Sequence, residues 1–186
     1  MPLAKLPIKR LEPLLRKFLS TKEYGETKKY IRELMTCKKR GYLTKIDLIK
    51  VCRWKSPRAI QHIKSNSEKK ILKITKKAFH TKSEKTRLEY LTRLSGVSVP
   101  MASSILMLTD PKRYGVIDIR VWELLYKLGI VKTNPGGANF KFREWYRYLM
   151  IIRYFAKKFK VKARDIERTL FNIHRRYQKG KLYANL

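Results

Sequence analysis

The residue in this sequence best placed for acid–base chemistry is an aspartate at the predicted start of an apolar helix. Asp118 follows Val116 and Ile117 and begins a stretch, residues 118–128, that is apolar nearly all round. Such a helix is expected in the centre of the molecule. Aspartate is also a preferred helix N-cap, which would explain its position without any chemistry. The two roles are compatible, because a carboxylate held in place and kept ionised can stabilise positive charge or deprotonate a water.

A second candidate site is the tight connection between two predicted helices that together span about residues 84–109. Gly96 permits a positive φ and the close approach of another molecule, Ser98 can cap the second helix, and Pro100 suits its first turn. Free backbone amides at such a turn form an anion site, for which a DNA phosphate is the obvious ligand. An ordinary helical hairpin that binds nothing explains the same residues.

A lysine and three tryptophans are candidates for a substrate pocket. Lys55 follows Trp54, which together with Arg53 and Arg58 could supply the desolvation and positive charge that turn a lysine into a nucleophile. A basic helix start with a packed tryptophan is the alternative. Flat side chains can hold a planar ligand such as a nucleobase between them. The candidates for this role are Trp54, which is the preferred one, Trp122 and Trp145, the last two of which also fit core packing.

The composition points to a polyanionic partner. The sequence has 46 Lys and Arg against 14 Asp and Glu, a net charge of +32, so we expect nucleic-acid binding that weakens steeply with added salt. Two cysteines without a neighbouring His and Cys run cannot complete a zinc or iron–sulfur site, so no metal cofactor is predicted. The absence of a long apolar stretch predicts an intracellular protein of the cytoplasm or nucleoid, away from membranes. Abundant Lys and scarce Gln hint at a thermophilic source.

The fold is predicted to be all-α. Apolar residues recur at helical spacing along almost the whole chain, and no segment alternates like a strand. Because no Pro- or Ser-rich linker divides the chain, residues 1–186 are expected to form one domain, a two-lobed helical bundle with a cleft between the lobes. Helices are predicted at 11–19, 26–38, 45–53, 57–64, 67–79, 84–94, 99–109, 118–128, 140–159 and 163–178.

Two segments, LSGVSVPMASSIL and VIDIRVWELLYKLG, together resemble the helix-hairpin-helix/Gly-Pro-Asp glycosylase superfamily, which includes endonuclease III and adenine glycosylase. In that family an LPGVG-type hairpin is followed, at this same interval, by a VD-x-x-V sequence whose aspartate is catalytic. Here Asp118 lies 22 residues after Gly96. The resemblance covers about 40 residues closely.

The resemblance implies a DNA glycosylase of base excision repair. Such an enzyme flips a damaged or mismatched base out of double-stranded DNA and hydrolyses its N-glycosidic bond, with Asp118 as the essential acid. Backbone amides of the hairpin would bind a phosphate, sometimes aided by a bound monovalent cation, and Arg120 would add a contact from the next helix. The predicted DNA-binding residues are therefore Ser95, Gly96, Val97, Ser98 and Arg120.

Two departures from the family pattern bear on the predicted activity. Ser98 stands where the family more often has a second glycine, which puts the cation in doubt. Pro100 stands where members that cleave the strand place a nucleophilic lysine. A monofunctional, monomeric glycosylase is therefore the simpler prediction. The alternatives are a bifunctional glycosylase and abasic-site lyase that uses a lysine such as Lys55, and a non-enzymatic helix-hairpin-helix protein that binds nucleic acid.

Overall fold

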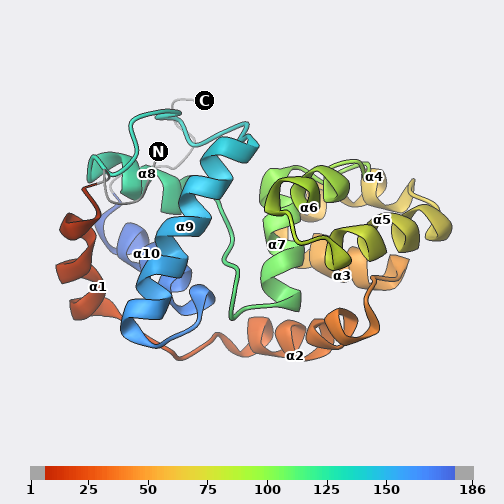
Figure 1. The fold of residues 1–186 in the computed structure, drawn as a ribbon, viewed down its shortest axis with the longest axis horizontal. Helices are drawn as coiled ribbons and strands as arrows, with labels where there is room; N and C mark the ends of the chain where they lie inside the picture. The colour runs from red at the N-terminus through yellow and green to blue at the C-terminus, as the bar shows by residue number, and fades with distance from the viewer. Residues whose placement is uncertain (1–6, 179–186) are drawn as a thin grey trace.

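Ten α-helices and two short 3-10 helices form the part of the chain that the computed structural model describes, residues 7–178 (Figure 1). No strand occurs in this range, so the predicted all-α fold is confirmed there. Residues 1–6 and 179–186 of the predicted single domain lie outside it. The helices are η2 (Ile8–Leu11), α1 (Glu12–Phe18), α2 (Gly25–Arg40), α3 (Lys45–Lys55), η3 (Pro57–Ala59), α4 (Ile60–Lys64), α5 (Glu68–His80), α6 (Glu84–Leu91), α7 (Val99–Thr109), α8 (Ile119–Lys127), α9 (Phe142–Phe159) and α10 (Ala163–Tyr177).

A helix is present in each of the ten predicted ranges: α7 has the predicted bounds, the range 57–64 contains η3 followed by α4, and the other helices differ from the prediction at one or both ends. Local sequence explains several of the ends. Thr44 and Asp47 form a capping box at the start of α3, in which the Asp47 amide donates to Thr44 Oγ1 at 3.2 Å and the Thr44 amide donates to Asp47 Oδ2 at 2.9 Å. Gly129 follows α8 with a φ of +68°, the left-handed conformation expected where this helix ends.

The helices pack as two groups that are joined by two crossings of the chain (Figure 1). One group contains α2 to α7, and the other contains α1, α8, α9 and α10. The chain crosses between the groups from α1 to α2 and again from α7 to α8, and α6 also contacts α9. Asp118 ends the second crossing, residues 110–118, and therefore lies where the two groups meet.

The central helix is α7, contrary to the prediction for residues 118–128. Every residue from Met101 to Thr109 is buried, and α2, α3 and α6 pack around this helix. Helix α8 buries one face, which includes Val121 and Leu125, but Tyr126 is 37 % exposed. The apolar residues of α8 therefore give it a broad buried face and leave one aromatic at the surface. No helix within residues 7–178 is both long and apolar enough to span a membrane.

The second crossing passes very close to α9 and α10. A Cβ on Gly115 would lie 2.6 Å from Glu167 Cβ and 2.7 Å from the Tyr148 hydroxyl oxygen, too close for any larger residue without a shift of its neighbours. One residue further on, the Tyr148 hydroxyl donates to the Val116 carbonyl at 2.9 Å. These contacts fix the backbone that leads into Asp118.

Candidate functional site

The two carboxylate oxygens of Asp118 have different neighbours. Asp118 is the N-cap of α8, and its Oδ1 accepts a hydrogen bond from the Val121 amide at 3.1 Å. Its Oδ2 lies 3.7 Å from the Nζ of Lys55, the last residue of α3. Both side chains are about one fifth exposed, at 18 % and 19 %. The structure thus brings together two candidates that lie 63 positions apart in the sequence, and it leaves one carboxylate oxygen facing the amine.

Asp118 and Lys55 line a pocket of about 270 Å³ between the two groups of helices. The pocket walls come from the segment before α2, from α2 itself, from the end of α3, from the second crossing and from α10. The lining residues are Tyr24, Thr27, Trp54, Lys55, Val116, Asp118, Arg164, Glu167, Arg168 and Phe171.

Three aromatic residues from three different elements line this pocket. Trp54 is partly buried, and its indole Nε1 donates to Thr27 Oγ1 at 3.1 Å. The Tyr24 hydroxyl donates to the side-chain oxygen of Asn172, and Phe171 lies beside that asparagine on α10. Among the predicted base-pocket residues, Trp54 is therefore found with Asp118. Tyr24 and Phe171 were missed, because nothing in their local sequence sets them apart.

Trp122 and Trp145 do not line the pocket, and in this respect the structure corrects the prediction. Both side chains are fully buried, at 0 % exposure. The Trp122 indole donates to the carbonyl of Asn134 at 2.9 Å, and its ring packs edge-on against Phe140 at a centroid distance of 5.5 Å. These two tryptophans are core residues, because the apolar faces of α8 and α9 turn into the protein.

The positive charge around Lys55 comes from a different place than its sequence neighbours. Arg53 and Arg58 are exposed and do not line the pocket. Two arginines of α10, Arg164 and Arg168, line it instead and are only 5 % and 1 % exposed. The guanidinium groups that share the pocket with Lys55 thus come from a helix more than a hundred residues away in the sequence.

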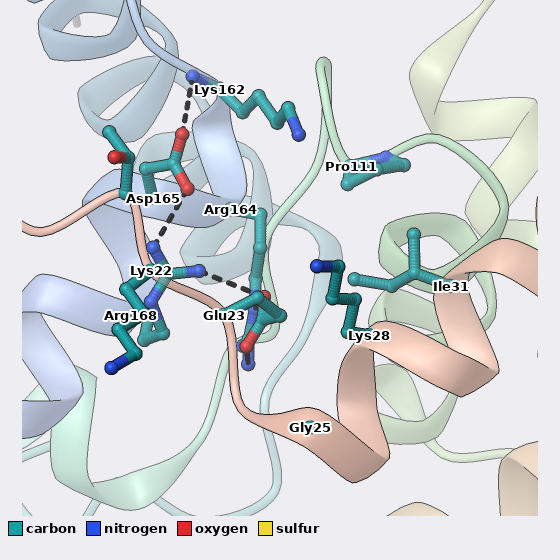
Figure 2. Close-up of a pocket in the computed structure, with 11 residues that line it drawn as sticks. Lys22, Glu23, Gly25, Lys28, Ile31, Pro111, Lys162, Arg164, Asp165 and Arg168 are labelled. Carbon is teal, nitrogen blue, oxygen red and sulfur yellow. Dashed lines mark hydrogen bonds and ion pairs between the residues drawn. The ribbon is translucent and has the colours of Figure 1, made fainter.

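Both arginines are anchored by a shared carboxylate from the first crossing. The Arg164 Nε and the Arg168 Nη1 each donate to Glu23 Oε2 at 2.8 Å, and Figure 2 shows the two guanidinium groups converging on this residue. Arg168 also pairs with Asp165 at 2.8 Å. Burial alone would raise the pKa of Glu23, but the hydrogen bond and charge of Arg164, together with the charge of Arg168, lower it below its ordinary value.

Glu167 is the most deeply buried acid of the pocket, at 2 % exposure. Arg164 Nη1 donates to its Oε2, whereas its Oε1 has no hydrogen-bond partner within residues 7–178. Burial raises the pKa of Glu167 and the charge of Asp118 adds to the rise, although Arg164 opposes it. Glu167 was not among the predicted site residues. The available signal was the pair of acids in ARDIER, in a chain with so few acids.

The connection between α6 and α7 has the predicted glycine conformation but a different packing environment. Gly96 has a φ of +78°. A Cβ on Gly96 would lie 2.9 Å from His62 Cβ and 3.2 Å from the Ile63 amide nitrogen, so the close approach is made by α4 of the same chain. Ser98 is the N-cap of α7, but its side chain makes no capping hydrogen bond, contrary to expectation.

Some backbone amides of this turn are used within the protein, and others are free. The Ser95 amide donates to Asn66 Oδ1 at 2.9 Å, and the Val97 amide donates to the Leu94 carbonyl at 3.1 Å. Within residues 7–178 the amides of Gly96, Ser98 and Val99 have no hydrogen-bond partner. Three neighbouring donors are therefore available at the start of α7, where the helix dipole also favours an anion.

The start of α7 is tied directly to the backbone before Asp118. Ser103 Oγ donates to the Pro100 carbonyl at 2.7 Å and accepts the Ile117 amide at 3.1 Å. Ser103 lies four residues after Val99, which is about 6 Å along the helix axis. Ser103 thus connects the start of α7 with the residue that precedes Asp118.

Arg120 lies half-buried in the first turn of α8. Its guanidinium lies 5.6 Å from the centroid of the Phe171 ring, and its Nη1 donates to Gln178. A DNA contact from this side chain would therefore compete with contacts inside the protein.

A second, larger pocket of about 480 Å³, drawn in Figure 2, shares Arg164 and Arg168 with the first. Lys22, Lys28 and Lys162 contribute to its lining, but it contains neither Asp118 nor Lys55. The smaller pocket is therefore the candidate site. Among residues 7–178 no group of three or more His, Cys, Asp or Glu side chains could hold a metal ion. No family model, curated protein or solved structure matches the chain.

Proposed function

We propose that this chain is a DNA glycosylase that hydrolyses the N-glycosidic bond of a damaged or mismatched base. The observation that carries the proposal is the Asp118 carboxylate, which is capped on one oxygen and open to a pocket and to Lys55 on the other. As the base leaves C1′, positive charge develops on the deoxyribose. A fixed carboxylate at that place stabilises this charge and orients or deprotonates the attacking water.

The pocket suits an extruded nucleotide in size and in chemistry. A volume of about 270 Å³ is sufficient for one base. Tyr24, Trp54 and Phe171 offer aromatic surface on which a base can stack, which offsets part of the few kcal/mol lost on unstacking it from the duplex. In this proposal the pocket is the deepest part of a cleft between the two helix groups, and the DNA lies across its mouth.

The turn between α6 and α7 acts in this proposal as a helix-hairpin-helix motif that holds the DNA backbone. A phosphate would accept from the free amides of Gly96, Ser98 and Val99. The hydrogen bonds through Ser103 would then fix the distance from this phosphate to Asp118. The net charge of +32 supplies the long-range attraction, so binding should be strongly salt-dependent.

A second candidate activity is abasic-site lyase activity with Lys55 as the nucleophile, and the 3.7 Å between Lys55 Nζ and Asp118 Oδ2 favours it. The ammonium would lose a proton to Asp118, and the neutral amine would attack C1′ and displace the base. The C1′–O4′ bond of the resulting aminal then breaks, its electron pair takes a proton to form the 4′-hydroxyl, and the imine formed in this way permits β-elimination of the 3′ phosphate. Pro100 stands where the resembled family has its hairpin lysine, and Lys55 from a different helix would then take the role of that lysine.

The test is a panel of duplexes that contain uracil, hypoxanthine, 8-oxoguanine or alkylated purines, incubated with the wild-type protein. Base release that requires alkali for strand cutting supports the monofunctional enzyme. A covalent adduct trapped by borohydride, absent in Lys55→Met, supports the lyase. If no duplex in the panel loses its base, the result supports a non-enzymatic protein that binds nucleic acid through the hairpin. In that protein Asp118 is only a helix cap.

A further inference from the structure

Glu167 places an unsatisfied carboxyl oxygen in the wall of the pocket. Its side chain is only 3 % exposed, and Arg164 Nη1 occupies Oε2. Oε1 has no hydrogen-bond partner within residues 7–178 and is not fully buried, as expected for an atom in the lining of the pocket. Gly115 packs against the Cβ of Glu167 and holds this side chain in place. The geometry therefore leaves Oε1 available to a group that enters the pocket.

The charged and titratable groups around Glu167 come from four elements. Arg164 lies on its own helix, Asp118 at the start of α8, Lys55 at the end of α3 and Tyr148 on α9. Burial and the nearby Asp118 carboxylate raise its pKa, while Arg164 and Lys55 oppose them. Because Arg164 donates to Oε2, a proton held by this carboxyl resides on Oε1.

We propose that Glu167 is the acid that protonates the leaving base. This inference rests on the proposed glycosylase function. As the C1′–N bond breaks, its electron pair stays on the base, and the proton of Glu167 Oε1 passes to a ring nitrogen or carbonyl oxygen of that base. Glu167 is left as a carboxylate paired with Arg164. C1′ forms a bond to the oxygen of the water, and the water gives a proton to Asp118. In the lyase alternative, C1′ forms a bond to the Nζ of Lys55 instead.

This assignment separates the two acids of the pocket by their surroundings. Asp118 has the Lys55 amine 3.7 Å from its Oδ2 and accepts the Val121 amide at the start of α8. Glu167 is deeper and faces a second negative charge. Two carboxyl groups held in such different settings suit opposite roles, one as a base or charge stabiliser and the other as a proton donor. The substrate implied is a base that would leave as an anion without this proton and that carries an acceptor on the edge facing α10.

The experiment compares wild type, Glu167→Gln and Asp165→Asn in single-turnover base release from about pH 5 to about pH 9, on any duplex that the wild type processes. Asp165→Asn is the matched control, because it neutralises another buried carboxylate of α10 that does not line this pocket. The wild-type rate should fall as pH rises through the raised pKa of Glu167. Glu167→Gln should be slower by about 100-fold at acid pH and should lack this alkaline fall.

Each outcome decides between specific alternatives. A Glu167→Gln protein with the wild-type rate and pH profile overturns the role of Glu167 and leaves the glycosylase function intact. An equal loss in Asp165→Asn shows that α10 is merely sensitive to charge removal and also overturns it. If Glu167→Gln fails to fold, a wild-type rate that does not fall at alkaline pH overturns the proposal. Absence of release by wild type from every duplex overturns the glycosylase function itself.

Discussion

Asp118 can be tested for catalysis separately from helix capping, because two substitutions divide its roles. Asp118→Asn keeps a side-chain oxygen that accepts the Val121 amide at the start of α8, and asparagine is as good an N-cap as aspartate. It removes only the negative charge that faces Lys55. Asp118→Ala removes the charge and the cap together. Comparison of the two variants therefore isolates the chemistry from the stability.

The expected stability changes are small. Loss of the cap in Asp118→Ala should cost about 1 kcal/mol of unfolding free energy. At the 3.7 Å separation, the attraction between Asp118 and Lys55 is roughly 4 kcal/mol for an effective dielectric constant of about 20. Partial exposure, desolvation and the lack of a hydrogen bond offset most of this, so the net loss is about 1 kcal/mol at most. Asp118→Asn should therefore lose no more than about 1 kcal/mol, and Asp118→Ala about 2 kcal/mol.

The expected change in rate is far larger. Removal of the carboxylate removes both the stabilisation of a positively charged sugar and the acceptor for a proton, so base release should fall about 100- to 10,000-fold in Asp118→Asn. Single-turnover release, urea unfolding and binding to a duplex with an abasic site measure the three quantities separately. Binding and stability should stay close to wild type. An Asp118→Asn protein that releases bases at the wild-type rate would refute the catalytic role and leave Asp118 as a cap.

Three further changes follow from the structure. Val99→Pro removes one free amide at the start of α7 and breaks no hydrogen bond, and the extended conformation of Ser98 is compatible with a proline after it. Relative to Val99→Ala it should weaken duplex binding about tenfold. Equal affinities of the two variants would argue against phosphate binding by the turn. Glu23 has a lowered pKa, so its stabilising effect is present above about pH 4.3 and is lost as pH falls through the lowered value; urea unfolding should show this acid loss in wild type and a flatter profile in Glu23→Gln. Gly115→Ala should cost about 1–3 kcal/mol in thermal unfolding, because its Cβ has no room; a wild-type Tm would show that the crossing shifts freely.

The sequence predicts the helices well because their signals are local. Apolar spacing marks each helix, and residues such as Thr44 and Gly129 mark ends through hydrogen bonds or φ values that involve only near neighbours. The positive φ of Gly96 is local in the same sense. What the local pattern does not contain is the partner of that glycine. The space for a Cβ is occupied by α4, a contact between segments more than thirty residues apart, so the sequence could not distinguish packing from ligand approach.

The sequence predicted several residues of the site but not how they are arranged. Lys55, Trp54 and Asp118 were chosen for their chemical type, and they share one pocket because α3 and the second crossing meet there. The choice of Trp122 and Trp145 failed because an aromatic at helical spacing has the same sequence signature in a core as in a pocket. Only the direction of the helix face, which depends on tertiary packing, separates the two.

The distribution of charge connects the fold with the proposed reaction. The chain has 14 acidic residues against 46 basic ones, yet Glu23, Asp118, Asp165 and Glu167 all lie where the two helix groups meet. Their charges are balanced there by Arg164, Arg168 and Lys55 rather than by solvent alone. A strongly positive chain attracts a polyanion, whereas the Asp118 carboxylate in the pocket would stabilise positive charge that develops on a deoxyribose. In the proposed reaction the DNA backbone would therefore lie at the surface, and the sugar and the base of an extruded nucleotide would enter the pocket.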